Sequence, residues 1–219
     1  MVQIQSPRPS KAKPRPSRST TILILLTIVA YLIGSTPVGV LVGRVRGFDP
    51  RTVGSGNVGM TNVARAGGKS AAAITFIGDV LKGLIPVALA RWFAGSDPTT
   101  LALVGFAAFV GSISSIFLGF KGGRGVATSV GVWLMIAPIP LAIALALFAA
   151  ILATTRIMSL ASLGAAMVLP AANAMTHSPR HYILLAIAMS ALVVFRHTEN
   201  ISRLLRGEEP RLGEKRKNA

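Results

Sequence analysis

A series of long apolar segments separated by short basic loops is the feature that most limits what this chain of 219 residues can fold into. The first segment covers residues 21–42, close to the ~20 residues that a helix needs to cross a bilayer. Five more follow, at residues 71–90, 101–118, 126–153, 159–175 and 182–195. No loop between them is long enough for a soluble domain, and helices satisfy their own backbone in lipid. The pattern therefore predicts an all-α, polytopic membrane helix bundle.

The composition excludes several other classes of protein. Apolar residues make up 52% of the chain and charged residues only 14%, which is unlike a disordered chain or a water-soluble domain. The formal net charge of +16 resides in the loops and tails that flank the apolar segments, so we expect no nucleic-acid partner. The chain has no cysteine, which excludes disulfides, thiolate metal sites and thioester intermediates.

Proline marks a break within the segment at residues 126–153. Pro138 and Pro140 remove backbone donors and clash with the preceding turn, so this segment is either one kinked helix or two short ones. Lys and Arg cluster at residues 44–69, at residues 121–124 and in the C-terminal tail, and such loops tend to stay cytoplasmic. All three clusters lie on one side of the membrane only if the chain crosses it an even number of times between residues 124 and 196, and a break at Pro138 supplies the extra crossing. We therefore expect about seven spans, two of them short and near the two prolines.

The chain divides into a transmembrane domain between two basic tails. Residues 1–20 are rich in Pro, Ser, Lys and Arg, and we expect a disordered tail that departs from the rule placing basic loops in the cytoplasm. A cleaved signal peptide has a shorter apolar region than residues 21–42 provide, so a retained span is favoured. Residues 21–200 form the expected transmembrane domain, and residues 201–219 a basic cytoplasmic tail.

The first of three candidate anion sites is the segment GSGNVGMTNVAR at residues 54–65, here called the first glycine loop. Glycine tolerates the positive φ values that let successive backbone amides converge on one anion. Arg65 can form a bidentate pair with a phosphate. A flexible, solvated loop is the alternative, but the density of polar donors beside the glycines favours a phosphate monoester site. The candidate phosphate-binding residues are Gly54, Ser55, Gly56, Asn57, Thr61, Asn62 and Arg65.

A second candidate anion site precedes the segment that starts at residue 126. Glycine-rich backbone and two cations enter a helix N-terminus there, where free amides and the helix dipole favour negative charge. The alternative is a plain basic flank of a membrane span, and spacing alone does not choose between them. The residues of this second glycine loop are Lys121, Gly122, Gly123, Arg124 and Gly125.

The third candidate site is the sequence RHTEN at residues 196–200, at the last membrane boundary. His197 can donate to a phosphate or accept a hydroxyl proton, and Asn200 lies one helical turn away on the same face. The alternative is an amphipathic basic end that rests on the lipid surface. Asp79 and Lys82 are spaced to form an ion pair inside a span, and we favour a structural role for them over catalysis.

These segments resemble the acyl-phosphate:glycerol-3-phosphate acyltransferase family, commonly called PlsY. The resemblance runs over residues 31–35, 54–65, 79–83, 120–128 and 196–210. It implies a bacterial inner-membrane enzyme of seven spans that moves a fatty acyl group from acyl phosphate to the sn-1 hydroxyl of glycerol 3-phosphate, giving lysophosphatidic acid. It also implies no metal or other cofactor, an active site on the cytoplasmic side, contact with membrane lipids, and the enzyme that makes acyl phosphate as a partner.

The resemblance assigns roles residue by residue. The implied catalytic residues are Ser55, Arg65, Ser162, His197 and Asn200. Arg124 stands where the family usually has the second lysine of KGGKG. We expect a phosphate oxygen of a substrate to take the proton of the attacking hydroxyl, with His197 as general base the second option.

Three departures from the family pattern keep other functions open. Ser112 stands where the family usually has a histidine, Arg124 replaces a lysine, and Met60 replaces a small residue. These changes allow a paralogue with altered specificity or little activity. An organic-phosphate transporter would also explain the anion sites, although we find no internal repeat in the sequence. A structural membrane partner is the third alternative, and it would tolerate loss of Ser55 and Arg65.

Overall fold

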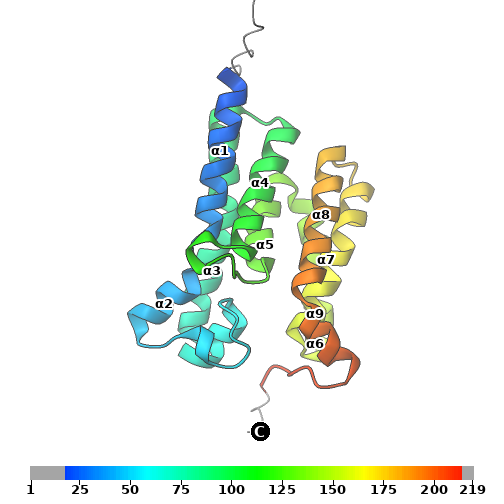
Figure 1. The fold of residues 1–219 in the computed structure, drawn as a ribbon. Coiled ribbons are helices and arrows are strands. Elements are labelled where there is room, and N and C mark those ends of the chain that lie inside the picture. Colours follow the sequence, from blue (N-terminus) through cyan, green and yellow to red (C-terminus); the bar gives the residue numbers. More distant parts are fainter. Residues whose placement is uncertain (1–17, 214–219) are drawn as a thin grey trace, which may run out of the picture.

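The computed structural model describes residues 18–213, and the fold of this part is entirely helical (Figure 1). The helices are α1 (Arg18–Ser35), α2 (Val38–Arg46), η1 (Pro50–Thr52), α3 (Met60–Ala94), α4 (Pro98–Ile113), η2 (Ile116–Leu118), α5 (Val126–Ile136), α6 (Pro138–Thr155), α7 (Met158–Met175), α8 (Arg180–Arg196) and α9 (Thr198–Leu205). The predicted all-α membrane bundle is confirmed.

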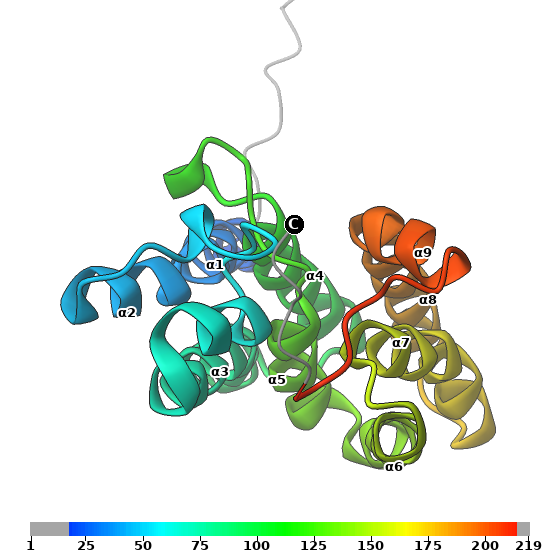
Figure 2. The same cartoon turned by 90° about the horizontal axis from the view of Figure 1, so that it is seen from below.

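The helices form two groups that meet along α4 and α5. Helices α1, α3, α4 and α5 pack on one side, and α6, α7 and α8 pack on the other (Figures 1 and 2). Fully buried Phe109 from α4 and Trp133 from α5 contribute to the core between them. The crossing of α3 and α5 is very close, because a β-carbon at Gly83 or Gly131 would collide with the backbone of the other helix.

Proline splits the predicted long segment into α5 and α6. Ala137 leaves the helical conformation, and Pro138 starts α6, where its missing N–H is not needed. Only α5 is short, with 11 residues, whereas α6 has 18 and spans about 27 Å. The expectation of two short halves is therefore corrected to one.

Five helical segments of the described chain are long and apolar enough to cross a membrane. The first is the segment Ser19–Arg46, which joins α1 and α2. Helices α8 and α9 make a sixth span if they are counted together, although α9 bends away by 62°. With the short α5, the count is close to the seven expected spans.

Helices extend into the ends of both predicted tails. Most of the predicted tail at residues 1–20 lies outside the described residues, but α1 already begins at Arg18. A helix extends back from its apolar part because each added residue gains a backbone hydrogen bond. At the other end, the predicted tail at residues 201–219 begins inside α9, and only residues up to 213 are described.

The ion pair predicted inside α3 is present. Lys82 Nζ lies 2.9 Å from Asp79 Oδ1 and also donates to the carbonyl of Thr36 at 2.9 Å. Thr36 lies at the break between α1 and α2, just before Pro37. Mutual neutralisation is the usual solution for charges at membrane depth. The pair also ties α3 to this break, which supports the structural role over a catalytic one.

Candidate active site

One buried side chain, that of Asn62, holds the first glycine loop in its conformation. Its Nδ2 donates to the carbonyls of Pro50 (2.6 Å) and Val53 (2.9 Å), and its Oδ1 accepts from the backbone N–H of Ser55 (3.0 Å). Both amide hydrogens of Asn62 are therefore used by carbonyls just before the loop. Asn62 thus supports the loop in this structure, and its role as a direct phosphate donor stays a prediction.

The other predicted residues of this loop lie nearer the solvent. Ser55 and Arg65 are exposed, and Thr61 is half-buried in the first turn of α3. Gly54 has a left-handed backbone (φ 59°), and a β-carbon there would come within 3.4 Å of Arg65 Cδ. The Arg65 stem thus passes beside Gly54. Its guanidinium and the Ser55 hydroxyl are free to meet a ligand.

Asn57 forms the junction between the first and second glycine loops. Its Oδ1 accepts from the N–H of Gly59, which precedes α3 (2.9 Å). A β-carbon at Gly123 would lie 3.7 Å from the same oxygen, with Val58 close by. The structure therefore places the two predicted anion loops side by side, which sequence spacing alone does not establish.

The second glycine loop is packed against the end of α4. Gly123 donates to the carbonyl of Ser112 (3.0 Å), and a β-carbon at Gly122 would collide with the backbone there. Gly125 has a left-handed backbone (φ 77°) and lies against the ring of Phe109. Lys121 is exposed. These glycines are required for close packing as well as for any contact with an anion.

Arg124 is the half-buried cation of this loop. Burial lowers the pKa of its guanidinium, and the nearby charge of Glu209 counteracts this effect. The group remains a cation at neutral pH because arginine loses its proton only far above it. The positive charge of Arg124 is thus partly desolvated. Because the surroundings are less polar than water, this charge attracts a phosphate more strongly than it would in water.

Arg196 joins the second glycine loop to the end of α8. Its Nη2 and Nε donate to the carbonyls of Gly122 (2.7 Å) and Gly123 (3.2 Å). The sequence motif at residues 196–200 contains this arginine, but we did not expect it to act on another loop. No glycine lies near Arg196 in the sequence, so no sequence signal indicated this contact.

His197 is 1% exposed and lies at the bend between α8 and α9. Its Nδ1 is 2.7 Å from the carbonyl of Val193, and because a carbonyl only accepts, Nδ1 carries the hydrogen. In the neutral ring Nε2 is therefore an acceptor, and it donates to a phosphate only when the ring is protonated. The same helix end places Asn200 one turn further, 3% exposed.

Glu209 is a functional candidate that the sequence did not indicate. It belongs to residues 207–213, here called the strap, which leave α9 and cross toward the end of α6 (Figure 2). Its carboxylate accepts from Ser159 Oγ (2.7 Å), Asn200 Nδ2 (2.5 Å) and Arg203 Nε (2.7 Å), and the side chain is 7% exposed. The acidic pair Glu208–Glu209 after the last helix was the only sequence signal.

The hydrogen bonds of Glu209 determine both its charge and the orientation of Asn200. Burial alone would raise the pKa of the Glu209 carboxyl, but its hydrogen bonds outweigh burial and lower the pKa below the ordinary 4.5. The ionised carboxylate only accepts hydrogen bonds, so the NH2 group of the Asn200 amide must face it. Asn200 Oδ1 is then buried without a hydrogen-bond partner among the described residues. This oxygen is therefore an unused hydrogen-bond acceptor.

Ser162 lies near this cluster, in the first turns of α7. It is buried, and its hydroxyl donates to the carbonyl of Met158 one turn earlier (2.9 Å). Ser159 on the same helix reaches Glu209, so α7 and α9 are joined through the strap. Among residues 18–213, no hydrogen bond joins Ser55 or Arg65 to this third cluster. The second glycine loop connects the two sides, touching Asn57 on one and Arg196 on the other.

The family model described as glycerol-3-phosphate acyltransferase matches residues 24–207. The chain belongs to this family. A glycerol-3-phosphate acyltransferase of Geobacter sulfurreducens is 46% identical over 188 residues, which cover 86% of this chain and 96% of the relative. One of Thioalkalivibrio sulfidiphilus is 46% identical over 194 residues, covering 88% and 95%.

Two solved structures of a member of the glycerol-3-phosphate acyltransferase family share the fold. Both are of PlsY (YgiH), described as an integral membrane glycerol 3-phosphate acyltransferase, and each covers 88% of this chain and 96% of that one. The glycerol 3-phosphate form has a TM-score of 0.84 at 40% identity, and the lysophosphatidic acid form 0.83 at 38%. The resemblance seen in the sequence motifs is thus confirmed, and this chain is an integral membrane member of the family.

Proposed function

We propose that this protein transfers a fatty acyl group from an acyl phosphate to the sn-1 hydroxyl of glycerol 3-phosphate, at the cytoplasmic face of a bacterial inner membrane. Family membership supports the acceptor and the class of reaction. The acyl-phosphate donor rests on the ordered motifs of the sequence, and the enzyme that makes acyl phosphate is the expected partner. The products are lysophosphatidic acid and inorganic phosphate.

The observation that carries this proposal is the unpartnered Oδ1 of Asn200. A buried acceptor without a partner is costly, and a substrate hydroxyl that donates to it removes that cost. The proposal places the sn-1 hydroxyl of glycerol 3-phosphate at this oxygen, next to His197 at the start of α9 and near Ser162 on the helix whose Ser159 shares Glu209 with Asn200. Asn200 would then orient the nucleophile, and Glu209 would hold Asn200 in place.

Two anions must approach each other in this reaction, so their mutual repulsion is the main obstacle. Arg124 and Arg65 supply positive charge, and Ser55 and the amides of the two glycine loops add neutral donors. Positioning and electrostatic stabilisation of this kind are a large part of catalysis where the substrate is already activated. Acyl phosphate is such a substrate, because it is a mixed anhydride with a good leaving group.

The acyl transfer itself needs no covalent intermediate on the protein. The hydroxyl oxygen attacks the acyl carbonyl carbon, the bond from that carbon to the phosphate oxygen breaks, and phosphate leaves with the electron pair. A phosphate oxygen of a substrate takes the hydroxyl proton. The neutral His197 ring, with its acceptor Nε2, is the second candidate for this step.

The test is acyl transfer by the full-length protein in lipid, with palmitoyl phosphate and glycerol 3-phosphate. We expect lysophosphatidic acid from the wild type and its loss in Arg65→Ala. Arg180→Ala is the matched control, because Arg180 is an exposed arginine at the start of α8 rather than in either glycine loop. Phosphate binding without acyl-phosphate consumption by folded wild type would refute the proposal in favour of transport.

A further inference from the structure

Two breaks in the backbone set apart the segment that carries the first glycine loop. Helix α1 ends at Ser35, and Pro37 has a non-helical backbone before α2 begins. Helix α3 is broken within its 35 residues at Gly68, whose φ of 80° and ψ of −178° lie in a region that essentially only glycine adopts. Residues 38–67, here called the lobe, contain α2, η1, the first glycine loop and the first turns of α3 (Figure 1).

The lobe is held together by contacts within itself. The three hydrogen bonds of Asn62 join the start of α3 to η1 and to the first glycine loop. The ring of Phe48 lies over Gly67, where a β-carbon would collide with it. A β-carbon at Gly39 of α2 would likewise collide with the carbonyl of Val58. These contacts connect the parts of the lobe to one another, so we expect it to move as one body.

Hydrogen bonds between the lobe and the rest of the bundle are few. Apart from the helix backbone itself, the one hydrogen bond that a lobe side chain makes beyond the two breaks, within residues 18–213, runs from Arg46 to the exposed Ser70 (2.5 Å). Asn57 and Val58 lie against Gly123 of the second glycine loop without a hydrogen bond to it. The two glycine loops therefore touch but are not bonded to each other.

A hollow of about 440 Å³ lies between α2 and η2, next to the first break. It is lined by the first break, α2 and η1 on one side and by Phe117 and Leu118 of η2 on the other. The segment that leads into η2 belongs to the rest of the bundle, because Ser115 Oγ donates to the carbonyl of Ser35 at the end of α1. The side of α2 that faces η2 is thus not filled, and the lobe has room to turn there.

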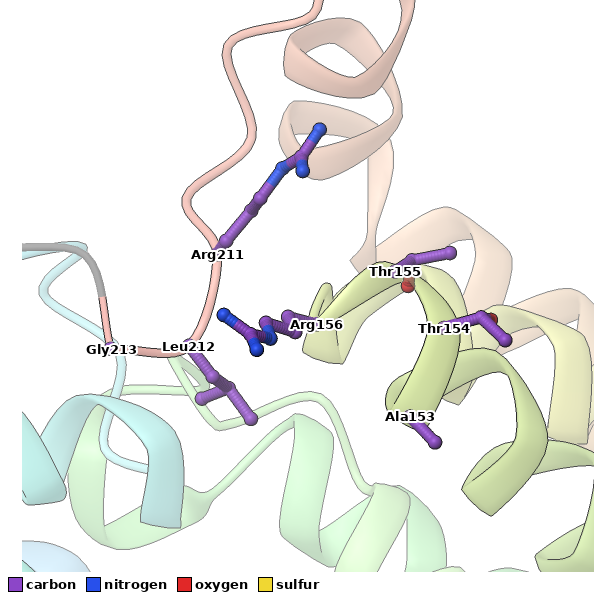
Figure 3. A pocket seen from close by; sticks show the side chains of 7 residues that line it. All are labelled: Ala153, Thr154, Thr155, Arg156, Arg211, Leu212 and Gly213. Carbon is purple, nitrogen blue, oxygen red and sulfur yellow. The ribbon is translucent and has the colours of Figure 1, made fainter.

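The opposite wall of the candidate site is held more firmly. Glu209 accepts from Ser159 of α7 and from Asn200 of α9. The strap continues to the end of α6, where the N–H of Leu212 donates to the carbonyl of Arg156 (2.8 Å) beside a hollow of about 460 Å³ (Figure 3). Helices α6, α7 and α9 are therefore joined by the strap, whereas the lobe lies between two breaks.

Both ends of the lobe are attached to the same part of α3. The carbonyl of Thr36, at the first break, accepts a hydrogen bond from Lys82 (2.9 Å), and Gly68 continues directly into residues 69–94. A body that is attached at two points to one helix turns about the line through those points. Such a rotation moves Ser55 and Arg65 relative to the second glycine loop.

We propose that the lobe turns about Pro37 and Gly68, and that the phosphate of the acceptor closes the first glycine loop onto the second. This inference rests on the proposed function, in which the acceptor is glycerol 3-phosphate. A phosphate between the loops attracts both Arg65 of the lobe and Arg124 of the second loop. It therefore binds the closed arrangement more tightly than the open one and shifts the population toward it. The loops touch in this structure, so it represents the closed arrangement.

The test is the distance between two spin labels, measured by pulsed electron paramagnetic resonance on the full-length protein in lipid nanodiscs. The chain has no cysteine, so labels attach only at introduced sites. Val45→Cys with Leu205→Cys reports on the lobe, because Val45 in α2 and Leu205 in α9 are 88% and 84% exposed. Ile74→Cys with Leu205→Cys is the matched control, since Ile74 is exposed on α3 beyond Gly68.

Glycerol 3-phosphate should narrow the distribution of the distance between labels 45 and 205. It should also shift the mean of this distance by more than about 2 Å, which is the size of a loop or domain rearrangement. The distance between labels 74 and 205 should stay unchanged.

Gly68→Ala tests the second break. Alanine disfavours the backbone conformation of Gly68, so glycerol 3-phosphate should not produce the closed distance in this variant, and its Kd should rise roughly tenfold or more. Gly95→Ala is the matched control, because Gly95 has nearly the same backbone (φ 79°, ψ −165°) at the other end of α3 and open space around its β-carbon position. It should change neither the distance nor the Kd.

Three results would overturn this inference. An unchanged distance between labels 45 and 205 in folded protein, at saturating glycerol 3-phosphate, would show that the lobe is fixed. An equal shift for both label pairs would show a movement of the whole bundle. Closure of Gly68→Ala like that of the wild type would exclude Gly68 as a hinge. Acyl transfer is measured on the same samples, so a fixed lobe in active protein refutes the hinge alone, and a moving lobe without product refutes the acyl transfer alone.

Discussion

Replacing Asn62 by alanine is expected to loosen the first glycine loop without unfolding the bundle. Asn62 makes three hydrogen bonds, to Pro50, Val53 and Ser55, and it is 2% exposed. At about 1 kcal/mol net for each bond, the loop loses roughly 3 kcal/mol of local stability. A free energy of this size corresponds to roughly a hundredfold higher population of the open loop.

Hydrogen exchange measured by mass spectrometry detects this change directly. In Asn62→Ala, backbone amides at residues 53–58 should exchange faster by up to roughly a hundredfold, because local opening governs their protection. Peptides from α4 should exchange as in the wild type. The KM for glycerol 3-phosphate should rise as well, since the loop no longer presents its amides in one arrangement.

Ser55→Ala is the matched control for this experiment. It removes a hydroxyl that makes no hydrogen bond within residues 18–213 but keeps the backbone N–H that donates to Asn62. Activity should therefore fall in Ser55→Ala while loop exchange stays unchanged. Unchanged exchange in Asn62→Ala together with a large loss of activity would refute the scaffold assignment and restore Asn62 as a direct ligand.

Three further predictions concern the second loop and the third cluster. Glu209→Gln should lower the melting temperature at neutral pH. The pKa of Glu209 in the folded protein lies below its ordinary 4.5, so the ionised carboxylate contributes its full stabilisation above pH 4.5. The difference in melting temperature from the wild type should therefore shrink as the pH falls below 4.5. Arg196→Gln should speed hydrogen exchange at residues 121–125 and lower acyl transfer, whereas Arg180→Gln should change neither. His197→Gln should keep most of its turnover if a substrate phosphate takes the proton, whereas a loss of turnover of a hundredfold or more at unchanged KM would identify His197 as the base.

Local chemistry made several features of the fold predictable. Pro138 suits the first turn of a helix and disfavours a helical conformation of the residue before it, so residue type favoured a break between α5 and α6, although α3 and α7 continue through Pro86 and Pro170. Asp79 and Lys82 are three residues apart inside an apolar segment, which left a mutual pair as the favourable arrangement. The family motifs also predicted the membrane topology and the class of reaction.

Contacts between distant segments were not predictable in the same way. Glu209 reaches Ser159 only because the strap folds back across fifty residues of sequence, and no local pattern encodes that return. Asn62 has the same donor chemistry whether it points to a ligand or into its own loop, so composition could not distinguish the two roles. Arg196 is similar, because its partners are backbone carbonyls that any glycine-rich loop would offer.

The close crossing of α3 and α5 determines a distance far from where it lies. Helix α3 begins inside the first glycine loop, is kinked at Gly68 and then crosses α5, which begins directly after the second loop. Gly83 and Gly131 bring the two helix backbones into contact deep in the bundle, where neither helix can slide past the other without a collision. The two helices that lead to the two loops are thus held together inside the bilayer by two glycines that lie far from either loop, and the kink at Gly68 sets the direction in which α3 continues to the first loop.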